Sequence, residues 1–316
     1  MAHTRLWGGI EAGGTKINCA IATASTTSSR SSRSPSGPAL PQILAETRIA
    51  TTTPAETIAQ IVHFFQVYQQ RVGPLETIGL ASFGPVDLHL SSPTYGYVLD
   101  TPKPGWRHID LLGGLGRSLQ LPIVLDTDVN AAALGEHRWG AAQGLDTFLY
   151  LTVGTGIGGG AMVNGKLLHG LLHPEMGHIL LRQDVSQDPF PGGCPFHGNC
   201  LEGLASGSAI AARWGKPADQ LPPEHPAWAL EAEYLAQAIA TFTFTLSPER
   251  IILGGGIMHQ QHLFPLVHRL ARAKLETYLA VPQVLEQIDR YIVPPLLGDQ
   301  AGILGAIALA QEGSGG

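Results

Sequence analysis

Charged residues and cysteines are both scarce in this chain of 316 residues, and the chain contains no long apolar run. Lys, Arg, Asp and Glu make up 14% of the residues, and 25 acidic against 19 basic side chains give a formal charge of −6. A chain without a basic excess creates no field that attracts phosphate backbones or anionic membranes, so we expect neither nucleic acid nor a membrane as a partner. No run approaches the roughly 20 apolar residues of a membrane-spanning helix, and residues 1–14 lack the apolar core of a secretory signal. We therefore expect a cytoplasmic protein.

Hydrophobic residues, by contrast, reach 44%, enough for a sizeable core. The length predicts two lobes, and strands that recur with helices predict an α/β architecture with a duplicated core. We expect residues 1–122 and a C-terminal helix at 301–313 to form a small lobe, with a flexible Ser-, Arg- and Pro-rich insertion at 24–41, and residues 123–300 to form a larger lobe. The expected strands are 6–10, 17–22, 78–83, 122–126, 147–153, 159–163 and 250–253, and the expected helices are 54–70, 111–119, 130–139, 228–247, 263–275 and 302–311.

Three glycine-rich turns follow β-branched runs, where backbone N–H groups can approach phosphate oxygens closely. None is a Walker loop, and such a turn taken singly is more often a plain hairpin turn. Together they predict a nucleotide site, with hydroxyl donors and one lysine added to the glycines. The residues concerned are Gly13, Gly14, Thr15 and Lys16 in the first turn, Thr155 and Gly156 in the second, and Gly254, Gly255 and Gly256 in the third.

Residues 126–130, Asp-Thr-Asp-Val-Asn, stand where a buried strand ends and a helix begins. Asp and Asn are ordinary helix caps at such a place, and capping is one interpretation of them. The other is that Asp128 accepts the proton of a substrate hydroxyl during phosphoryl transfer. The local sequence leaves both open.

Two of the three cysteines belong to a cluster with metal-ligand spacing. His178, Cys194, His197 and Cys200 supply two imidazoles and two thiols, a set that predicts tetrahedral zinc. Because the protein fills all four positions, we expect a structural rather than a catalytic site. Cys19, alone in an apolar strand, is expected to be core packing, and His169 and His173 are expected to have surface or packing roles.

The motifs resemble those of the ROK family of sugar kinases and sugar-responsive repressors. The matching segments are 9–16, 128–136, 154–158 and 173–178, while 83–87, 101–106 and 194–203 are similar to those of the bacterial ROK fructokinases. The resemblance covers the chain except residues 24–41. It implies an actin-like (ribonuclease H-like) fold, ATP and Mg²⁺ as cofactors, and a homodimer.

The resemblance also implies roles for single residues. Asp128 is the general base, and the residues implied at the sugar are Thr127, Asn130, Glu175, His178, Glu202, Gly84 and Pro85. Asn130 is equally explained as a helix cap. Two positions depart from the common pattern: Thr127 replaces an Asn, and Glu11 replaces an Asp that helps to hold Mg²⁺.

These expectations converge on transfer of the γ-phosphate of ATP to the 6-hydroxyl of fructose. Mannose, glucose and an N-acetylated hexosamine remain alternative substrates, because pocket shape rather than motif decides among sugars. A sugar-sensing regulator is disfavoured, since few residues precede the first glycine turn and a helix-turn-helix domain is expected there. An actin-like ATPase would share the glycine turns but has no use for Glu175, His178 and Glu202.

Overall fold

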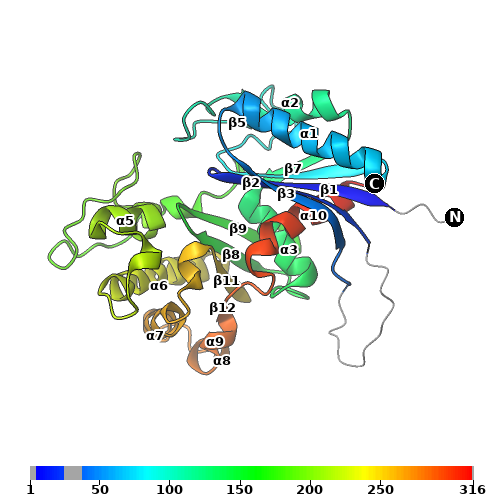
Figure 1. The fold of residues 1–316 in the computed structure, drawn as a ribbon. Helices are drawn as coiled ribbons and strands as arrows, with labels where there is room; N and C mark the ends of the chain where they lie inside the picture. Colours follow the sequence, from blue (N-terminus) through cyan, green and yellow to red (C-terminus); the bar gives the residue numbers. More distant parts are fainter. Residues whose placement is uncertain (1–4, 25–37, 315–316) are drawn as a thin grey trace. The chain divides into compact units, whose positions relative to one another are not determined.

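The computed structural model describes residues 5–24 and 38–314, and the chain divides into two compact units (Figure 1). Unit 1 comprises Met1–Gly144, Leu167–His173 and Gln300–Gly316, and unit 2 comprises Leu145–Lys166 and Pro174–Asp299. Most of the predicted insertion at 24–41 lies outside the described residues. The first division falls at residue 144 rather than at the expected 122, because β7 (Ile123–Thr127) pairs in parallel with β4 (Thr77–Ser82) and so belongs to the first sheet.

Unit 1 contains a five-stranded sheet in the order β3-β2-β1-β4-β7. β1 (Leu6–Ala12), β2 (Lys16–Thr23) and β3 (Gln42–Ala50) are antiparallel, whereas β4 and β7 run parallel to β1. The apolar runs of β1, β2, β4 and β7 were predicted, but β3 was not. Its sequence, QILAETRIA, keeps only Ala45 and Ile49 buried, so its apolar signal is weak.

Helices cover both faces of this sheet (Figure 1). α1 (Pro54–Val72) and α2 (Leu111–Leu119) lie on one face, and the Thr53 side chain caps α1. α3 (Asp128–Trp139) and α10 (Ala301–Gly313) lie on the other and pack closely together. A side chain at Gly79 of β4 would collide with the backbone of α10, so a glycine is required for this contact. The segment between β4 and α2 is largely loop, with a short ribbon of β5 (Tyr97–Val98) and β6 (Ile109–Asp110).

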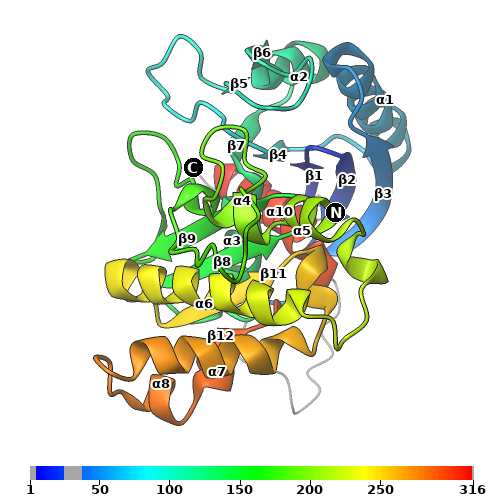
Figure 2. The same cartoon turned by 90° about the vertical axis from the view of Figure 1, so that its left-hand side faces the viewer.

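Unit 2 repeats this strand order. Its sheet runs β10-β9-β8-β11-β12, with an antiparallel β8-β9 pair and with β11 and β12 parallel to β8, so the core is duplicated as predicted. The strands are β8 (Phe148–Val153), β9 (Ile157–Val163), β10 (Lys166–Leu167), β11 (Arg250–Gly254) and β12 (Ile292–Val293). The helices are α4 (Leu201–Ala205), α5 (Gly207–Trp214), α6 (Ala227–Leu246), α7 (Leu263–Leu275), α8 (Pro282–Leu285) and α9 (Ile288–Tyr291), of which α6 and α7 lie side by side (Figure 2).

Helix α6 contains a buried acid, Glu231. Glu231 is 2% exposed, and within the part of the chain that the structure describes neither of its carboxyl oxygens has a hydrogen-bond partner. Burial raises the pKa of Glu231 well above its ordinary value, while the nearby Arg213 opposes that effect. The folded protein therefore holds Glu231 as the neutral acid at pH values where the unfolded chain has released the proton.

We accordingly expect Glu231→Met to stabilise the protein. An unsatisfied buried polar group costs about 1–3 kcal/mol, and methionine fills a similar volume. Because the folded-state pKa is raised, the advantage of Glu231→Met should grow as the pH rises above about 4.3, the ordinary pKa of Glu. Thermal unfolding at pH 4 and pH 7 measures it, with the exposed Glu224→Met as control. A variant no more stable than wild type at pH 7 would show that Glu231 is satisfied.

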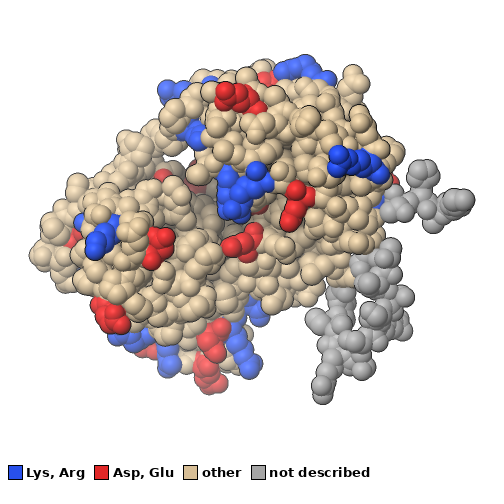
Figure 3. Space-filling model, viewed as in Figure 1, with Lys and Arg blue, Asp and Glu red and all other residues tan. Residues whose placement is uncertain are grey.

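The scarcity of charge is visible on the surface: on the face in Figure 3, Lys, Arg, Asp and Glu lie scattered among uncharged residues. Among the described residues, no helix is both long and apolar enough to cross a membrane.

Candidate functional site

Three predicted site segments leave the sheet of unit 1 at one edge. β1, β4 and β7 are parallel, and Ala12, Ser82 and Thr127, their last residues, are aligned across the sheet. The first glycine turn, the Gly84–Pro85 segment and Asp128 therefore all follow strand ends at the same edge, where α/β proteins commonly bind ligands.

The structure identifies the residue that caps α3, whereas the role of Asp128 as general base stays a prediction. The Thr127 side chain caps α3 by accepting the Asn130 N–H at 3.1 Å. Asp128 is the first residue of the helix, is half-buried, and accepts the N–H of Val129 at 2.9 Å. A carboxylate that is not the cap keeps acceptor capacity for a substrate proton.

Asp126 is the centre of a buried polar cluster two residues before Asp128. Its Oδ1 accepts the Thr127 N–H at 2.7 Å and the Asn130 Nδ2–H at 2.9 Å, and its Oδ2 lies 2.9 Å from Nε2 of His169. Asn130 is fully buried, and its Oδ1 has no hydrogen-bond partner among the described residues. The Asn130 side chain thus supports the Asp126 carboxylate and does not cap α3, while its contact with a sugar stays a prediction.

His169 has a more specific role than the surface or packing one expected. The hydrogen bond to Asp126 raises the pKa of His169 despite partial desolvation, and the charge of Asp126 and a hydrogen bond to the backbone of Leu167 act in the same direction. The charged imidazolium is therefore favoured in the folded protein.

A raised pKa makes the stabilisation by His169 dependent on pH. It is fully present below about 6.5, the unfolded value, and is lost as the pH rises through the higher folded value. We expect His169→Leu to lower Tm most at pH 5.5 and progressively less at alkaline pH. The exposed His63→Leu on α1 is the control. A Tm loss independent of pH would contradict the charged pair.

The segment that carries His169 also borders a hollow. A cavity of about 350 Å³ is lined by Leu88, His89, Leu90, Ser91, His169, Gly170 and Leu172. Nearby, the Val86 N–H donates to Nε2 of buried His173 at 3.1 Å. His173 therefore packs the Gly84–Pro85 loop against residues 167–173.

The first glycine turn closes the β1-β2 hairpin. The Gly13 N–H donates to the Lys16 carbonyl at 3.0 Å, and Gly14, Thr15 and Lys16 are exposed. Glu11 accepts the Asn18 side-chain amide at 2.7 Å. The turn thus exposes the Thr15 hydroxyl and the Lys16 ammonium group, and the nearby Glu11 carboxylate is held by Asn18.

The other two glycine turns meet at one edge of the sheet of unit 2. β8 and β11 are parallel, with Thr152 opposite Gly254, so the turn before Ile157 and the 254–256 turn follow neighbouring strand ends. Gly255 has φ of 90°, and a side chain there would press on the Val153 backbone. The structure thus brings two of the three predicted phosphate turns together, and a 3₁₀ turn, Gly256–His259, continues from the third.

Two predicted sugar-binding carboxylates are positioned by the start of β9. The Ile157 N–H donates to Oε2 of Glu202 at 2.9 Å, and Gly177, two residues after Glu175, lies against the Ile157 carbonyl, where no side chain would fit. Desolvation, with a smaller contribution from the Glu202 charge, raises the pKa of Glu175 to about 7. Glu175 can therefore both donate and accept hydrogen bonds near neutral pH.

The four predicted metal ligands converge. Their ligand atoms all lie within 4.8 Å of one another. Nδ1 of His178 is 3.7 Å from Sγ of Cys194 and 3.6 Å from Sγ of Cys200, and Nδ1 of His197 is 3.8 Å from Sγ of Cys194. Ligands at 2.0–2.3 Å around a tetrahedral ion are separated by roughly 3.3–3.8 Å, so the cluster fits one ion. Cys200 also caps α4, in which Glu202 is the second residue.

Comparison with known proteins gives this arrangement a family. Residues 7–313 match the model of the ROK family. The chain belongs to the ROK family. A fructokinase of Zymomonas mobilis subsp. mobilis is 42% identical over 97% of this chain and 96% of its own length, and a fructokinase of Pediococcus pentosaceus is 39% identical over 97% and 98%. The crystal structure of a ROK glucokinase from Streptomyces griseus in complex with glucose and AMPPNP is 26% identical, covers 97% of this chain and 99% of that chain, and superposes with a TM-score of 0.68.

Membership of the ROK family confirms the sequence-based recognition and the actin-like fold. The sequence did not predict that Asp126 pairs with His169 in this ROK protein. For Asp126, its place at the end of the predicted buried strand 122–126 could have indicated a functional carboxylate. His169 carried no local signal, because its partner is 43 residues away.

Proposed function

We propose that this ROK protein is an ATP-dependent fructokinase that transfers the γ-phosphate of ATP to the 6-hydroxyl of D-fructose, giving fructose 6-phosphate and ADP. The observation that carries the proposal is the half-buried Asp128 carboxylate, which follows the end of β7 beside the parallel strand β4 and does not serve as the cap of α3. Relatives named fructokinase, 39% and 42% identical over nearly the whole chain, favour fructose as the substrate.

Asp128 acts as the general base. The oxygen of the 6-hydroxyl attacks the γ-phosphorus, the bond from phosphorus to the β,γ-bridging oxygen breaks, and the hydroxyl proton passes to the Asp128 carboxylate. Thr127 holds the first turn of α3, and Asp126 holds the Thr127 N–H, so the base projects from a rigid strand-to-helix junction. Positioning and charge stabilisation supply most of the rate enhancement in such reactions.

Glu175 and Glu202 bind the sugar hydroxyls. The Ile157 N–H holds Glu202, Gly177 two residues after Glu175 lies against the Ile157 carbonyl, and with a pKa of about 7 Glu175 can match a hydroxyl as donor or acceptor. His178 follows Glu175 closely in the chain, and its Nδ1 belongs to the metal cluster. We therefore propose that Nδ1 of His178 binds the metal. Only Nε2, its other ring nitrogen, could then contact the sugar.

Nucleotide phosphates bind at the glycine turns. Thr155 and Gly156 in one turn and Gly254, Gly255 and Gly256 in its neighbour offer N–H and hydroxyl donors, and the Gly13–Lys16 turn offers Lys16. Mg²⁺, when bound, would neutralise part of the phosphate charge. Glu11 is the residue of this chain that we propose as a ligand of Mg²⁺.

The metal cluster holds a structural zinc ion. Two thiols and two imidazoles form a donor set that zinc prefers, and the spacing of the ligand atoms fits a tetrahedron. The ion fastens the segment after Glu175 to the loop before Glu202. We also propose a homodimer, from the family resemblance; sedimentation analysis that finds only monomers would contradict it.

A coupled ADP-release assay tests the substrate. Fructose, mannose, glucose, N-acetylglucosamine and N-acetylmannosamine are compared at matched enzyme concentrations, with a sugar-free reaction to measure ATPase activity. We expect kcat/KM to be highest for fructose and ADP release to be negligible without sugar. A higher kcat/KM for another sugar would replace fructose as the substrate, and sugar-independent turnover would favour an ATPase.

A further inference from the structure

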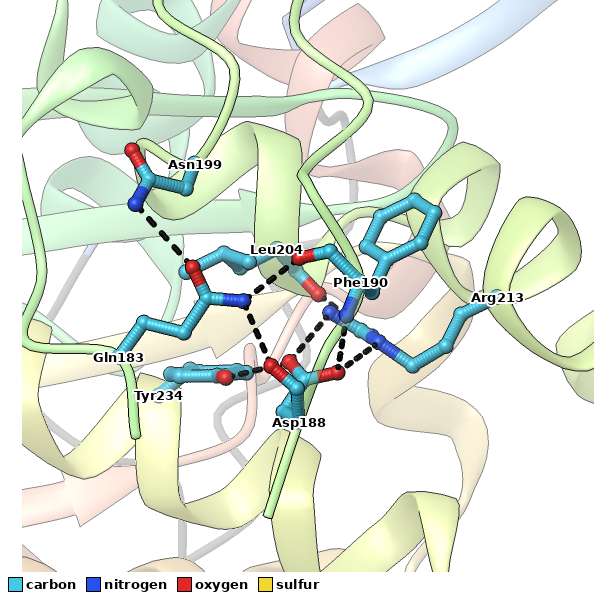
Figure 4. A network of polar contacts seen from close by, with 7 residues as sticks. All are labelled: Gln183, Asp188, Phe190, Asn199, Leu204, Arg213 and Tyr234. Carbon is cyan, nitrogen blue, oxygen red and sulfur yellow. Dashed lines mark hydrogen bonds and ion pairs between the residues drawn. The ribbon is translucent and has the colours of Figure 1, made fainter. Parts of the chain in front are cut away.

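A buried ion pair lies in unit 2 among residues that none of the predicted site motifs includes (Figure 4). The Asp188 and Arg213 side chains are 3% and 8% exposed, and Nε and Nη2 of Arg213 each donate to one carboxylate oxygen of Asp188 at 3.1 Å. The Tyr234 hydroxyl donates to Oδ2 of Asp188 at 2.5 Å. The guanidinium carbon lies 4.6 Å from the centroid of the Phe190 ring. Both carboxylate oxygens of Asp188 thus accept hydrogen bonds from side chains. The two parallel hydrogen bonds fix the orientation of the planar Arg213 guanidinium.

The pair joins the metal loop, defined here as residues 178–200, to the helix that carries Glu202. Asp188 lies in this loop, and Nη1 of Arg213 donates to the Leu204 carbonyl in α4 at 2.8 Å. A single guanidinium therefore holds both the loop and α4.

Gln183 stiffens the same loop from within (Figure 4). Its amide nitrogen donates to the backbone carbonyls of Asp188 and Phe190 at 3.0 and 2.6 Å, and its Oε1 accepts the Asn199 amide at 3.1 Å. Asn199 stands between the metal ligands His197 and Cys200. The loop is therefore supported at Asp188 independently of the metal.

Arg213 lies near the C-terminal end of α5, whose other end touches the second glycine turn. The Gly207 N–H donates to the Gly154 carbonyl at 2.7 Å, and the Ser208 hydroxyl donates to the Thr155 carbonyl at 2.8 Å. An eight-residue helix is about 12 Å long. α5 thus fixes the distance between the phosphate turn and the metal loop.

We propose that Arg213 is a positioning residue for the phosphoryl transfer: through Asp188 and the Leu204 carbonyl it holds Glu202 and the metal loop in place against the phosphate turn. The proposal rests on the proposed sugar contact of Glu202. A buried ion pair is seldom more stabilising than apolar residues of the same volume, so its value here is the geometry that a bidentate fork imposes.

The test separates geometry from stability. Arg213→Met and Asp188→Leu each leave one buried charge unpaired and should lower Tm, whereas the double variant removes both charges and should regain much of that loss. We expect all three to raise KM for fructose about tenfold or more, with KM for ATP changed less than about twofold, because the Gly207 and Ser208 contacts remain. Arg213→Lys, which keeps the charge without the fork, should fall between wild type and Arg213→Met. Arg272→Met, at an exposed arginine of α7, is the control.

A second measurement does not depend on the substrate. Amide hydrogen exchange of residues 179–199 should be faster in the double variant than in wild type, in protein of the same zinc content. Unchanged exchange, or a double variant with the wild-type KM for fructose, would overturn the proposal. If the wild type phosphorylates no sugar, the proposed function fails, and the exchange measurement alone decides whether Arg213 positions the loop.

Discussion

Replacing Asp128 by asparagine should lower kcat by a factor on the order of 10² to 10⁴, the usual contribution of a positioned general base. Asparagine has nearly the same shape, and its Oδ1 can still accept the Val129 N–H that Asp128 accepts at 2.9 Å. Thr127 continues to cap α3. The change therefore removes the proton acceptor and leaves the strand-to-helix junction intact.

The measurement is steady-state ADP release with fructose and ATP, together with thermal unfolding. We expect Tm and both KM values to stay near those of wild type while kcat falls. Asp219→Asn, at an exposed carboxylate, controls for the loss of one charge. Turnover by Asp128→Asn near the wild-type rate would remove Asp128 from the catalytic role.

The second large effect should come from the metal cluster, through Cys200→Ser. Serine is a poor zinc ligand but a good helix cap, so the N–H of Gly203, which Sγ accepts at 3.5 Å, still finds an acceptor. The substitution thus weakens the metal site without removing the cap of α4. Metal binding that requires the folded protein adds several kcal/mol to its stability, so Tm should fall by roughly 10 °C or more.

The same variant should bind sugar more weakly, because the zinc holds the segments that carry Glu175 and Glu202. We expect a lower zinc content, a lower Tm and a higher KM for fructose together, and the same three changes after chelation of the wild type. Cys19→Ala, which removes the buried cysteine of β2, should leave zinc content unchanged. A wild-type preparation with no metal, full activity and an unchanged Tm would contradict a structural zinc.

The parts of the fold that were predictable are those whose pattern is local. The helix predicted at 111–119 begins and ends as the apolar spacing indicates, and so does the helix predicted at 263–275. β3 was not predicted, because an edge strand needs few buried residues. The short, small-residue sequence GSAIAARW of α5 did not show a clear helical period, although its N-cap Ser206 is visible in retrospect.

The site divides in the same way. The metal ligands were predictable because three of them lie within seven residues of one another, and the structure brings the fourth to them. The role of Asp128 was not settled by the sequence, because Asp126, Thr127 and Asp128 are all residues that can cap a helix. Only the geometry assigns the cap to Thr127. Asp188, Arg213 and Tyr234 form a unit only in three dimensions, since no recognised motif contains them and Asp188 lies 25 and 46 residues from its two partners.

The place of α10 in unit 1 has a consequence for how the protein is made. The last helix of the described chain packs against the first strand, β1, and against β4, with Gly79 and Gly305 admitting its backbone to close contact with β4 and α3. On the ribosome, β1 to β4 are synthesised early, but the face of their sheet that α3 and α10 cover stays partly open until residues 301–313 have followed. Residues 145–166 and 174–299, which form unit 2, are synthesised before α10. Unit 1 therefore completes its core after unit 2 has been synthesised, and a nascent chain stalled before residue 301 would present part of an apolar sheet face to chaperones.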